Sequence, residues 1–228
     1  QNKSKEPLPG YKDIKPMVFS GMYPVDSQDY ADLRKSLDKL KLNDSSLEFT
    51  PNTSHALGFG FRCGFLGPLH MEIVQERLER EFNMDLITTC PNVRYKVAML
   101  DKSYIDLDNP SDLPETGSIH KIYEPYIRAE IISPSEYIGV IMNICINRRA
   151  KYKSTNFLSE EKVQLIFHMP LGEIIYDFFE KLKASTKGYA TLDYDIIEDK
   201  PGDLRRLDIK ITGEIIDALS IIVHKDNA

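Results

Sequence analysis

Cysteine and long apolar runs are scarce in this chain of 228 residues, and its basic residues are outnumbered by acidic ones. The three cysteines, Cys63, Cys90 and Cys145, are widely spaced and odd in number, which argues for a reducing compartment and against a disulfide framework or a zinc knuckle. No apolar run approaches the roughly 18 residues of a membrane span. The formal net charge is −6, so any RNA contact must come from a local basic patch.

Signals of a natural chain start are also missing. The sequence begins with Gln1 rather than methionine and shows no signal-peptide pattern. It stops just after the apolar run 221–223. We therefore expect a piece of a longer protein.

The candidate motifs for catalysis, cofactor binding and metal binding are all incomplete. The glycine spacing in 58–67 fits neither the dinucleotide fingerprint nor the P-loop, and no Gly-Lys-Ser/Thr follows. Residues 70–72 have the H-x-E form of a zinc deaminase but lack its P-C-x-x-C partner. The acidic segment 100–121 lacks the glycine and terminal glutamate of a calcium loop, and no G-x-S-x-G elbow occurs. We expect no catalytic, cofactor-binding or metal-binding residue in this chain.

The stretch 58–82 carries the clearest structural signal. Phenylalanine and cysteine alternate with glycine over 58–65, which predicts a strand with one aromatic face and one nearly bare face. Gly67 turns the chain, and Pro68 suits the first position of a helix. Arg62 is the one long side chain on the bare face, so we expect it to meet whatever packs there. Apolar residues at helical spacing predict a buried stripe on the helix, namely Leu69, Ile73, Val74, Leu78 and Phe82.

The same order of strands and helices occurs twice along the chain. Residues 17–99 predict βαββαβ, with a last strand at 86–99 that Pro91 interrupts, and residues 122–199 predict βαββαβ again. Proline is also expected to bound two elements, with a turn at 51–54 and a helix that opens at Pro170.

The segments between and around these two units read as linkers or as part of another unit. Residues 1–16 and the acidic segment 100–121 are typical of linkers, whereas 200–228 look like the start of a further β-rich domain. We therefore predict an α+β fold: two tandem ferredoxin-like βαββαβ sandwiches and a truncated β-rich C-terminal segment.

Several of these segments resemble one known family. The stretch 58–82, SPSEYIG at 133–139, PLGEIIYDFF at 170–179 and STKGYATLDYD at 185–195 are similar to the LepA-type translational GTPases, also called elongation factor 4. The resemblance covers nearly the whole chain. It implies that 17–99 is similar to domain III of elongation factor G, 122–199 to domain V, and 200–228 to the start of the LepA C-terminal domain. Pro68 and Ala150 depart from the leucine and glycine expected there, and Ala150 puts a positive-φ turn in doubt.

The resemblance implies a factor that binds the ribosome, both ribosomal RNA and proteins, and tRNA. It implies GTP hydrolysis with Mg²⁺ in a domain upstream of residue 1, in cis, and action on tRNA position (back-translocation) or on ribosome maturation. It also implies a monomer in the cytoplasm, with peripheral association at the inner face of the cell membrane and no transmembrane segment.

One basic segment is the candidate RNA contact. Four cations surround Tyr152 where a predicted helix ends and a strand begins: Arg148, Arg149, Lys151 and Lys153. A solvated helix end explains them about as well as RNA does, and the resemblance favours RNA. Lys183 and Lys187 form a second cluster, expected on the same edge. Arg62 and His70 are candidate contacts to another domain or a partner.

Three rival functions stay open. The first is another translational GTPase, of the elongation factor G or TypA type. The second is an acylphosphatase-like enzyme, which needs an arginine in its phosphate loop; residues 23–27 contain none, and Asp26 would repel the anion. The third is a small-molecule-binding regulatory module of paired ferredoxin-like domains. Fold alone decides none of them.

Overall fold

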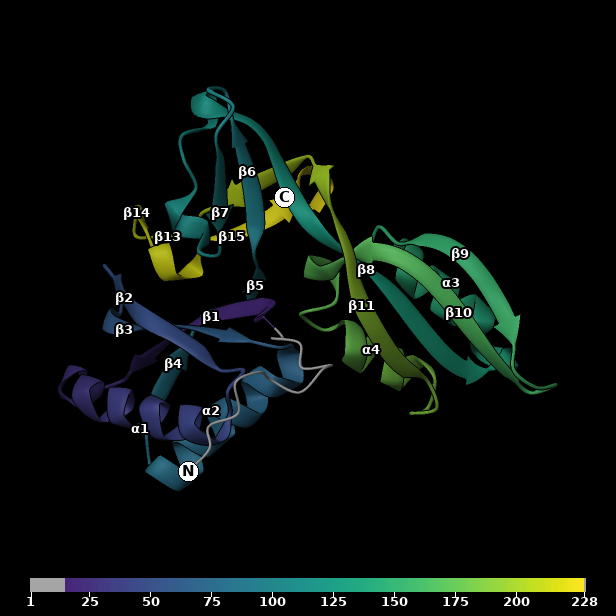
Figure 1. Ribbon diagram of the computed structural model, residues 1–228, viewed down its shortest axis with the longest axis horizontal. Coiled ribbons are helices and arrows are strands. Elements are labelled where there is room, and N and C mark those ends of the chain that lie inside the picture. The colour runs from purple at the N-terminus through teal and green to yellow at the C-terminus, as the bar shows by residue number, and fades with distance from the viewer. Residues whose placement is uncertain (1–14, 228) are drawn as a thin grey trace, which may run out of the picture.

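The computed structural model describes residues 15–227, so most of the predicted linker 1–16 lies outside the described residues. Two α/β units lie side by side, and a β-rich C-terminal segment contacts both of them (Figure 1). Within the described range, no helix is both long enough and apolar enough to cross a membrane.

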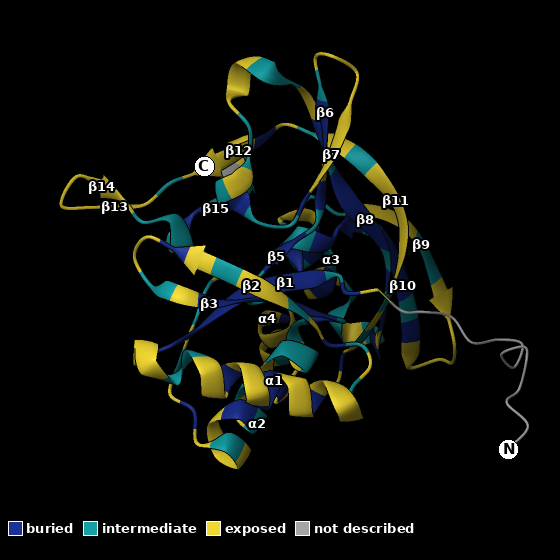
Figure 2. Cartoon of the chain, turned by 60° about the vertical axis from the view of Figure 1, so that its left-hand side comes forward, coloured by how far each residue is buried: buried dark blue, intermediate teal, exposed yellow. Residues whose placement is uncertain are grey.

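The first unit is a ferredoxin-like sandwich. Its elements follow the order β1 (Val18–Pro24), α1 (Tyr30–Asn43), β2 (Glu48–Ser54), β3 (Gly58–Phe65), α2 (Pro68–Phe82) and β4 (Leu86–Thr88). The antiparallel sheet has the strand order β2-β3-β1-β4, and the short β5 (Asn92–Val93) extends the pairing of β1. Both helices cover one face of the sheet, and the outward side of α1 is exposed (Figure 2). The predicted βαββαβ order is confirmed.

The alternation in β3 builds this unit. Phe61, Cys63 and Phe65 are fully buried in the core beneath the helices, and the Phe61 ring stacks on Tyr30 at 4.9 Å between centroids. The glycine face is covered by aromatic rings of β1: a Cβ at Gly60 would lie 2.4 Å from the Tyr23 ring. Glycine is therefore required there because the ring approaches the backbone so closely.

Two local predictions for this unit are wrong. The expected turn at 51–54 is strand instead, because β2 is the edge strand of its sheet and Pro51 needs no ladder partner on its free side. The predicted stripe on α2 is only partly buried: Val74 and Leu78 are buried, whereas Leu69 and Ile73 are exposed.

The strand predicted at 93–99 does not complete the first sheet. β6 (Tyr95–Met99) forms a hairpin with β7 (Tyr104–Leu107) and also pairs with the second unit's first strand, β8 (Ile119–Pro134). The segment 100–121, predicted as a linker, thus contains β7, two short 3-10 turns and the start of β8. The acidic residues of the segment 100–121 therefore lie in the β6–β7 hairpin and next to it.

The second unit repeats the fold. After β8 come α3 (Ile138–Ile146), β9 (Lys151–Phe157), β10 (Lys162–Pro170), α4 (Phe178–Ser185) and β11 (Thr191–Gly202). The sheet runs β7-β6-β8-β10-β9, with β11 paired to β8. The helix predicted to open at Pro170 begins only at Phe178, because a 3-10 turn over Leu171–Glu173 comes first.

Strands β8 and β11 form a long two-stranded ribbon. Their pairing runs from Ile132 opposite Thr191 to Ile122 opposite Gly202, with one irregularity between Ile196 and Glu198. At about 3.4 Å per residue this ribbon is about 35 Å long. It joins the body of the second unit to the β6–β7 hairpin and to the C-terminal segment.

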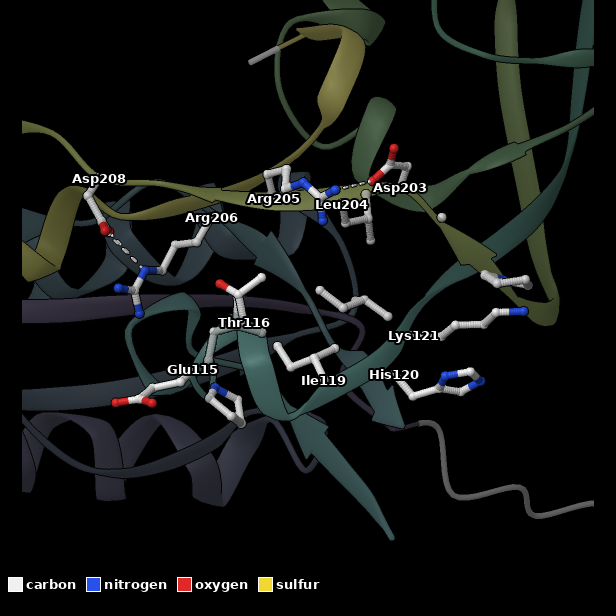
Figure 3. Close-up of a pocket in the computed structure, with 15 residues that line it drawn as sticks. Glu115, Thr116, Ile119, His120, Lys121, Asp203, Leu204, Arg205, Arg206 and Asp208 are labelled. Atoms are coloured by element: carbon white, nitrogen blue, oxygen red, sulfur yellow. Dashed lines mark hydrogen bonds and ion pairs between the residues drawn. The ribbon is translucent and has the colours of Figure 1, made fainter. Parts of the chain in front are cut away.

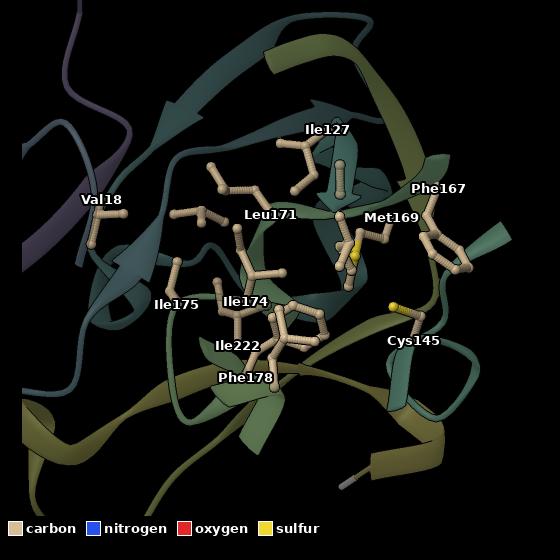
Figure 4. Packing of buried hydrophobic residues seen from close by; sticks show 14 of the residues in the cluster. Val18, Ile127, Cys145, Phe167, Met169, Leu171, Ile174, Ile175, Phe178 and Ile222 are labelled. Atoms are coloured by element: carbon tan, nitrogen blue, oxygen red, sulfur yellow. The ribbon is translucent and has the colours of Figure 1, made fainter. Parts of the chain in front are cut away.

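The C-terminal segment contains two small antiparallel pairs. β12 (Leu204–Leu207) pairs with β15 (Ile221–His224), and β13 (Lys210–Ile211) pairs with β14 (Glu214–Ile215). Leu204 and Ile222 enter the core of the second unit, and so do Val18 and Val93 from the first unit (Figure 4). The second core is therefore continuous with both of its neighbours.

Candidate nucleic-acid interface

Arg149 lies in the turn three residues after the end of α3 and has the left-handed conformation, with φ 57°. The positive-φ turn that Ala150 put in doubt is therefore present, one residue earlier. Its guanidinium forms two hydrogen bonds of 2.8 Å to the Glu124 carboxylate and one of 2.7 Å from Nε to Glu173. Burial alone would lower the pKa of Arg149, but the two carboxylates outweigh it and raise the pKa above its ordinary value.

Arg148 is also engaged within the chain. It forms an ion pair with Asp177, the residue before α4, which Lys181 contacts from the other side. The hydrogen bonds and charges of Lys181 and Arg148 lower the pKa of Asp177. The sequence predicted an open helix exit, whereas the structure turns both arginines of this pair toward acidic partners of the same unit.

Lys151 and Lys153 are exposed on β9, the edge strand. Tyr152, between them, points the other way and meets the buried ring of Phe167 edge-on at 6.0 Å. The two lysines therefore lie on the sheet face that is turned away from α3 and α4.

Cross-strand register extends this positive charge across the sheet. Lys151 lies opposite His168 of β10, and His168 lies opposite Arg128 of β8. We call Lys151, His168 and Arg128, with the adjacent Lys153, the cationic row. Burial first, and then the charges of Lys153 and Lys200, lower the pKa of His168. Arg128 pairs with Glu130 on its own strand, so the lysines provide the accessible charge.

Sequence reasoning missed Arg128 and His168 as members of this row. Each stands alone in its own strand, and nothing near it in the sequence marks a basic patch. Only the pairing of β8, β10 and β9 brings them beside Lys151. A hint was available in the period of two along each strand, which puts both residues on the face opposite the apolar positions.

Lys183 and Lys187 lie at the other end of the helical layer. Arg148 contacts the residue that precedes α4, whereas Lys187 follows the end of that helix, about 12 Å away at 1.5 Å per residue. The contact of Arg148 and the position of Lys187 therefore lie at opposite ends of α4. Lys183 lies over the Phe179 ring, and the exposed Tyr189 stacks on Tyr137 at 6.4 Å. This second group combines cations with aromatic faces.

His70 and Arg62 both find partners inside the first unit. His70 accepts a 3.0 Å hydrogen bond from the Leu66 N–H at Nδ1 and contacts Asp44 at 2.7 Å through Nε2. Arg62 donates from Nη2 to Asn92 at 2.7 Å. Contact with the second unit is made nearby at Gly67, where a Cβ would lie 2.8 Å from the Tyr194 hydroxyl.

A cleft of about 920 Å³ separates residues 113–122 from 201–208 (Figure 3). Its arginines are paired inside the cleft, Arg205 with Asp203 and Arg206 with Asp208, both at 3.0 Å. The paired charges leave little net positive field for a phosphate. Histidine, cysteine and acidic side chains form no group of three suited to a metal ion anywhere in 15–227.

Comparison with known proteins agrees with this architecture. Residues 121–209 match the family model described as elongation factor G C-terminus. The chain is 54% identical over 228 residues, its whole length, to elongation factor 4 of Geobacillus thermodenitrificans, and covers 37% of that protein. It is 56% identical over 225 residues (99% of the chain) to elongation factor 4 of Chlorobium limicola, again covering 37% of it.

A third relative, elongation factor 4 of Lactobacillus gasseri, is 53% identical over 228 residues, with all of this chain and 37% of that protein covered. The chain thus spans a little over a third of the length of these curated relatives. With similarity of this degree along its whole length, the chain belongs to the elongation factor 4 family, of which it represents one segment.

Proposed function

We propose that this chain is the ribosome-binding middle portion of a GTP-hydrolysing translation factor of the elongation factor 4 type. The observation that carries the proposal is the similarity to elongation factor 4 over the full chain. The two ferredoxin-like units in tandem agree with it. The same similarity favours this family over an elongation factor G or TypA type.

In this proposal the chemistry lies outside the 228 residues. A GTPase domain upstream of residue 1 would bind GTP and Mg²⁺ in cis. The parent protein would act on tRNA position, by back-translocation, or on ribosome maturation. It would work as a monomer in the cytoplasm, and a peripheral association with the inner face of the membrane belongs to the same proposal.

The role of this segment would be mechanical. The domain boundaries that we propose follow the sequence, 17–99 and 122–199 with the C-terminal domain from 200, except that β6 (Tyr95–Met99) and the end of β11 (Thr191–Gly202) pair with β8 and so go with the second unit. The ribbon of β8 and β11 and the shared core around Val18 and Ile222 make the packing between these parts extensive. A movement that the GTPase state imposes on one unit would therefore be transmitted to the other unit as a nearly rigid-body movement.

We assign the RNA contact to the cationic row. Lys151 and Lys153 supply exposed charge, while Arg148 and Arg149 shape the turn that presents them. Lysine acts on phosphate as a point charge, so the contact would be electrostatic and tolerant of sequence. Lys183 and Lys187 would form a separate contact, with Tyr189 available to stack on a base.

Ribosome co-sedimentation of the full-length parent at several salt concentrations tests this assignment. Lys151→Glu together with Lys153→Glu should weaken binding and flatten the salt dependence by about one unit of log–log slope per lost phosphate contact. Lys162→Glu is the matched control, because Lys162 is exposed at the opposite end of the same β9–β10 hairpin.

Circular dichroism checks that all three proteins are folded. Equal affinity and slope for the double variant and the parent would place the ribosome contact elsewhere on the molecule. Lys162→Glu makes half the change in charge of the double variant, so a loss about half as large in this control would show a general effect of charge rather than a contact at the row.

A further inference from the structure

A polar pocket of about 320 Å³ lies between the first unit and the C-terminal segment. Its walls come from β1, β2 and β3, from the segment 89–92, from the turn at 109–112 and from residues 217–220. Pockets of this volume hold small organic molecules. Among its lining residues, Arg62 is the one arginine.

The Arg62 guanidinium is buried without a direct ion pair, although the charges of Asp108 and Asp112 act on it from beyond 4.0 Å. The residue is 9% exposed, and in the described part of the chain it forms no ion pair within 4.0 Å. One nitrogen, Nη2, donates to Asn92, whereas Nε is out of contact with solvent and has no hydrogen-bond partner. A water-sized group cannot reach Nε, so an acceptor in the pocket would meet the terminal guanidinium nitrogens. A buried cation without an ion pair is unfavourable unless such an acceptor, and best an anion, is present.

Neutral donors accompany the arginine in this pocket. The Tyr23 hydroxyl accepts a 2.8 Å hydrogen bond from Asn52, so its own proton is available to donate. Burial raises the pKa of Tyr23, which keeps the phenol protonated. Asn92 uses its oxygen on Arg62 and retains its amide N–H groups. These groups suit an oxygen-rich anion.

Two carboxylates restrict the charge of that anion. Asp112 and Asp217 also line the pocket. Asp217 is held by hydrogen bonds from the Ser54 hydroxyl at 2.6 Å and from the His55 N–H at 2.9 Å. With one arginine against two aspartates the lining has a net negative charge, which opposes a dianion most and a free monoanion less. A carboxylate whose molecule also carries an ammonium or hydroxyl is favoured, because those donors would find acceptors in the same wall.

We propose that the Arg62 pocket binds the carboxylate group of a small organic molecule. The carboxylate would accept from the guanidinium and from Tyr23, and donors on the rest of the ligand would face Asp112 and Asp217. The proposal is independent of ribosome binding. Water alone is the alternative occupant of a polar pocket of this kind.

The test follows the Nε–H resonance of Arg62 by ¹⁵N NMR in the 228-residue chain. This proton is shielded from solvent, so its exchange should be slow enough for detection. Sodium acetate and glycine are titrated against sodium chloride at constant ionic strength, with inorganic phosphate above its second pKa as the dianion. We expect a saturable shift with acetate and a tighter one with glycine, and weaker binding of phosphate.

Two variants localise the effect. Arg62→Lys keeps the charge but loses the planar fork, and should weaken glycine binding by about tenfold or more, as for loss of a charged hydrogen bond. Arg94→Lys is the matched control, because Arg94 also lies against the Phe19 ring but is half-exposed and pairs with Asp108. It should bind glycine like the unmodified chain, as measured by isothermal titration calorimetry.

The titration of the unmodified chain decides the question even where Arg62→Lys fails to fold. No saturable shift with acetate or glycine would overturn the proposal and leave water as the occupant. Tighter binding of phosphate than of either carboxylate would overturn it as well, because the carboxylates of the wall would then not select the charge. Equal loss in Arg94→Lys would show that the anion lies elsewhere.

Discussion

Replacing Arg149 by methionine should destabilise the second unit by about 3 kcal/mol, the lower end of the range for breaking a buried ion pair. The substitution leaves Glu124 and Glu173 without their cation, and their side chains are only 4% and 11% exposed. The Arg149 side chain itself is 22% exposed, which moderates the loss. Methionine keeps the aliphatic length and meets the same left-handed backbone as arginine, so the comparison isolates the charge.

Urea unfolding followed by far-UV circular dichroism measures the loss, since the chain has no tryptophan. With an m-value of about 2 kcal/mol per molar, the midpoint should fall by about 1.5 M. Adding Glu124→Gln and Glu173→Gln to Arg149→Met should restore much of the difference. Lys151→Ala, on the exposed strand beside it, should stay within about 0.5 kcal/mol of the parent chain. A midpoint for Arg149→Met within error of that control would refute the inward role of Arg149.

Three further predictions concern other sites. Burial alone would raise the pKa of Asp44, but hydrogen bonds from Ser46 and His70 lower it. The lowered pKa stabilises the folded chain at pH values above the ordinary pKa of about 3.9, and this stabilisation is lost as the pH falls through the pKa of Asp44 in the folded state. Asp44→Asn should thus cost about 1–2 kcal/mol at neutral pH and nothing in strong acid, by urea unfolding at both pH values; a pH-independent loss would contradict this. Gly60→Ala should lower the melting temperature, because its Cβ would lie 2.4 Å from the Tyr23 ring and 2.5 Å from a carbonyl oxygen. Gly139→Ala, with no neighbour within 4 Å, should instead raise the free energy of unfolding by up to about 1 kcal/mol. Similar effects of the two substitutions would disprove the close packing at Gly60. Ellman's reagent should modify only Cys90 quickly, because burial raises the pKa of the other two thiols to about 12; a second fast thiol would be inconsistent with their burial.

The sequence located β3 and α2 to the residue because strong local features coincide there. The strict alternation over 58–65, the turn at Gly67 and the proline at the helix start all act within a few residues. The sheet predicted for the strand 95–99 is wrong, because no comparable local feature marks its partner. Its alternation fits either sheet, and its actual partner β8 lies some twenty residues further along the chain. Local pattern predicts that a strand forms, whereas partner choice depends on the whole fold.

The candidate interface shows the same limit. Charge density in the sequence picked out the segment 148–153, and its two lysines are indeed exposed. It could not reveal that Arg149 turns inward, because the carboxylates that hold it come from positions 25 and 24 residues away. Nor could it join His168 and Arg128 to Lys151, since three strands must first align.

The ribbon of β8 and β11 also decides where this protein can be shortened. A piece that ended at residue 199 would remove Lys200, Pro201 and Gly202, the partners of residues 122–124 in β8. Those positions would become an open strand edge, which invites pairing between separate molecules and aggregation. A start at residue 122 would remove the residues of β8 that pair with Ala98 and Met99 of β6. Recombinant versions of the second unit should therefore keep residues 95 to 202 at least, so that β6 and β11 both stay paired with β8, or they will tend to associate during purification.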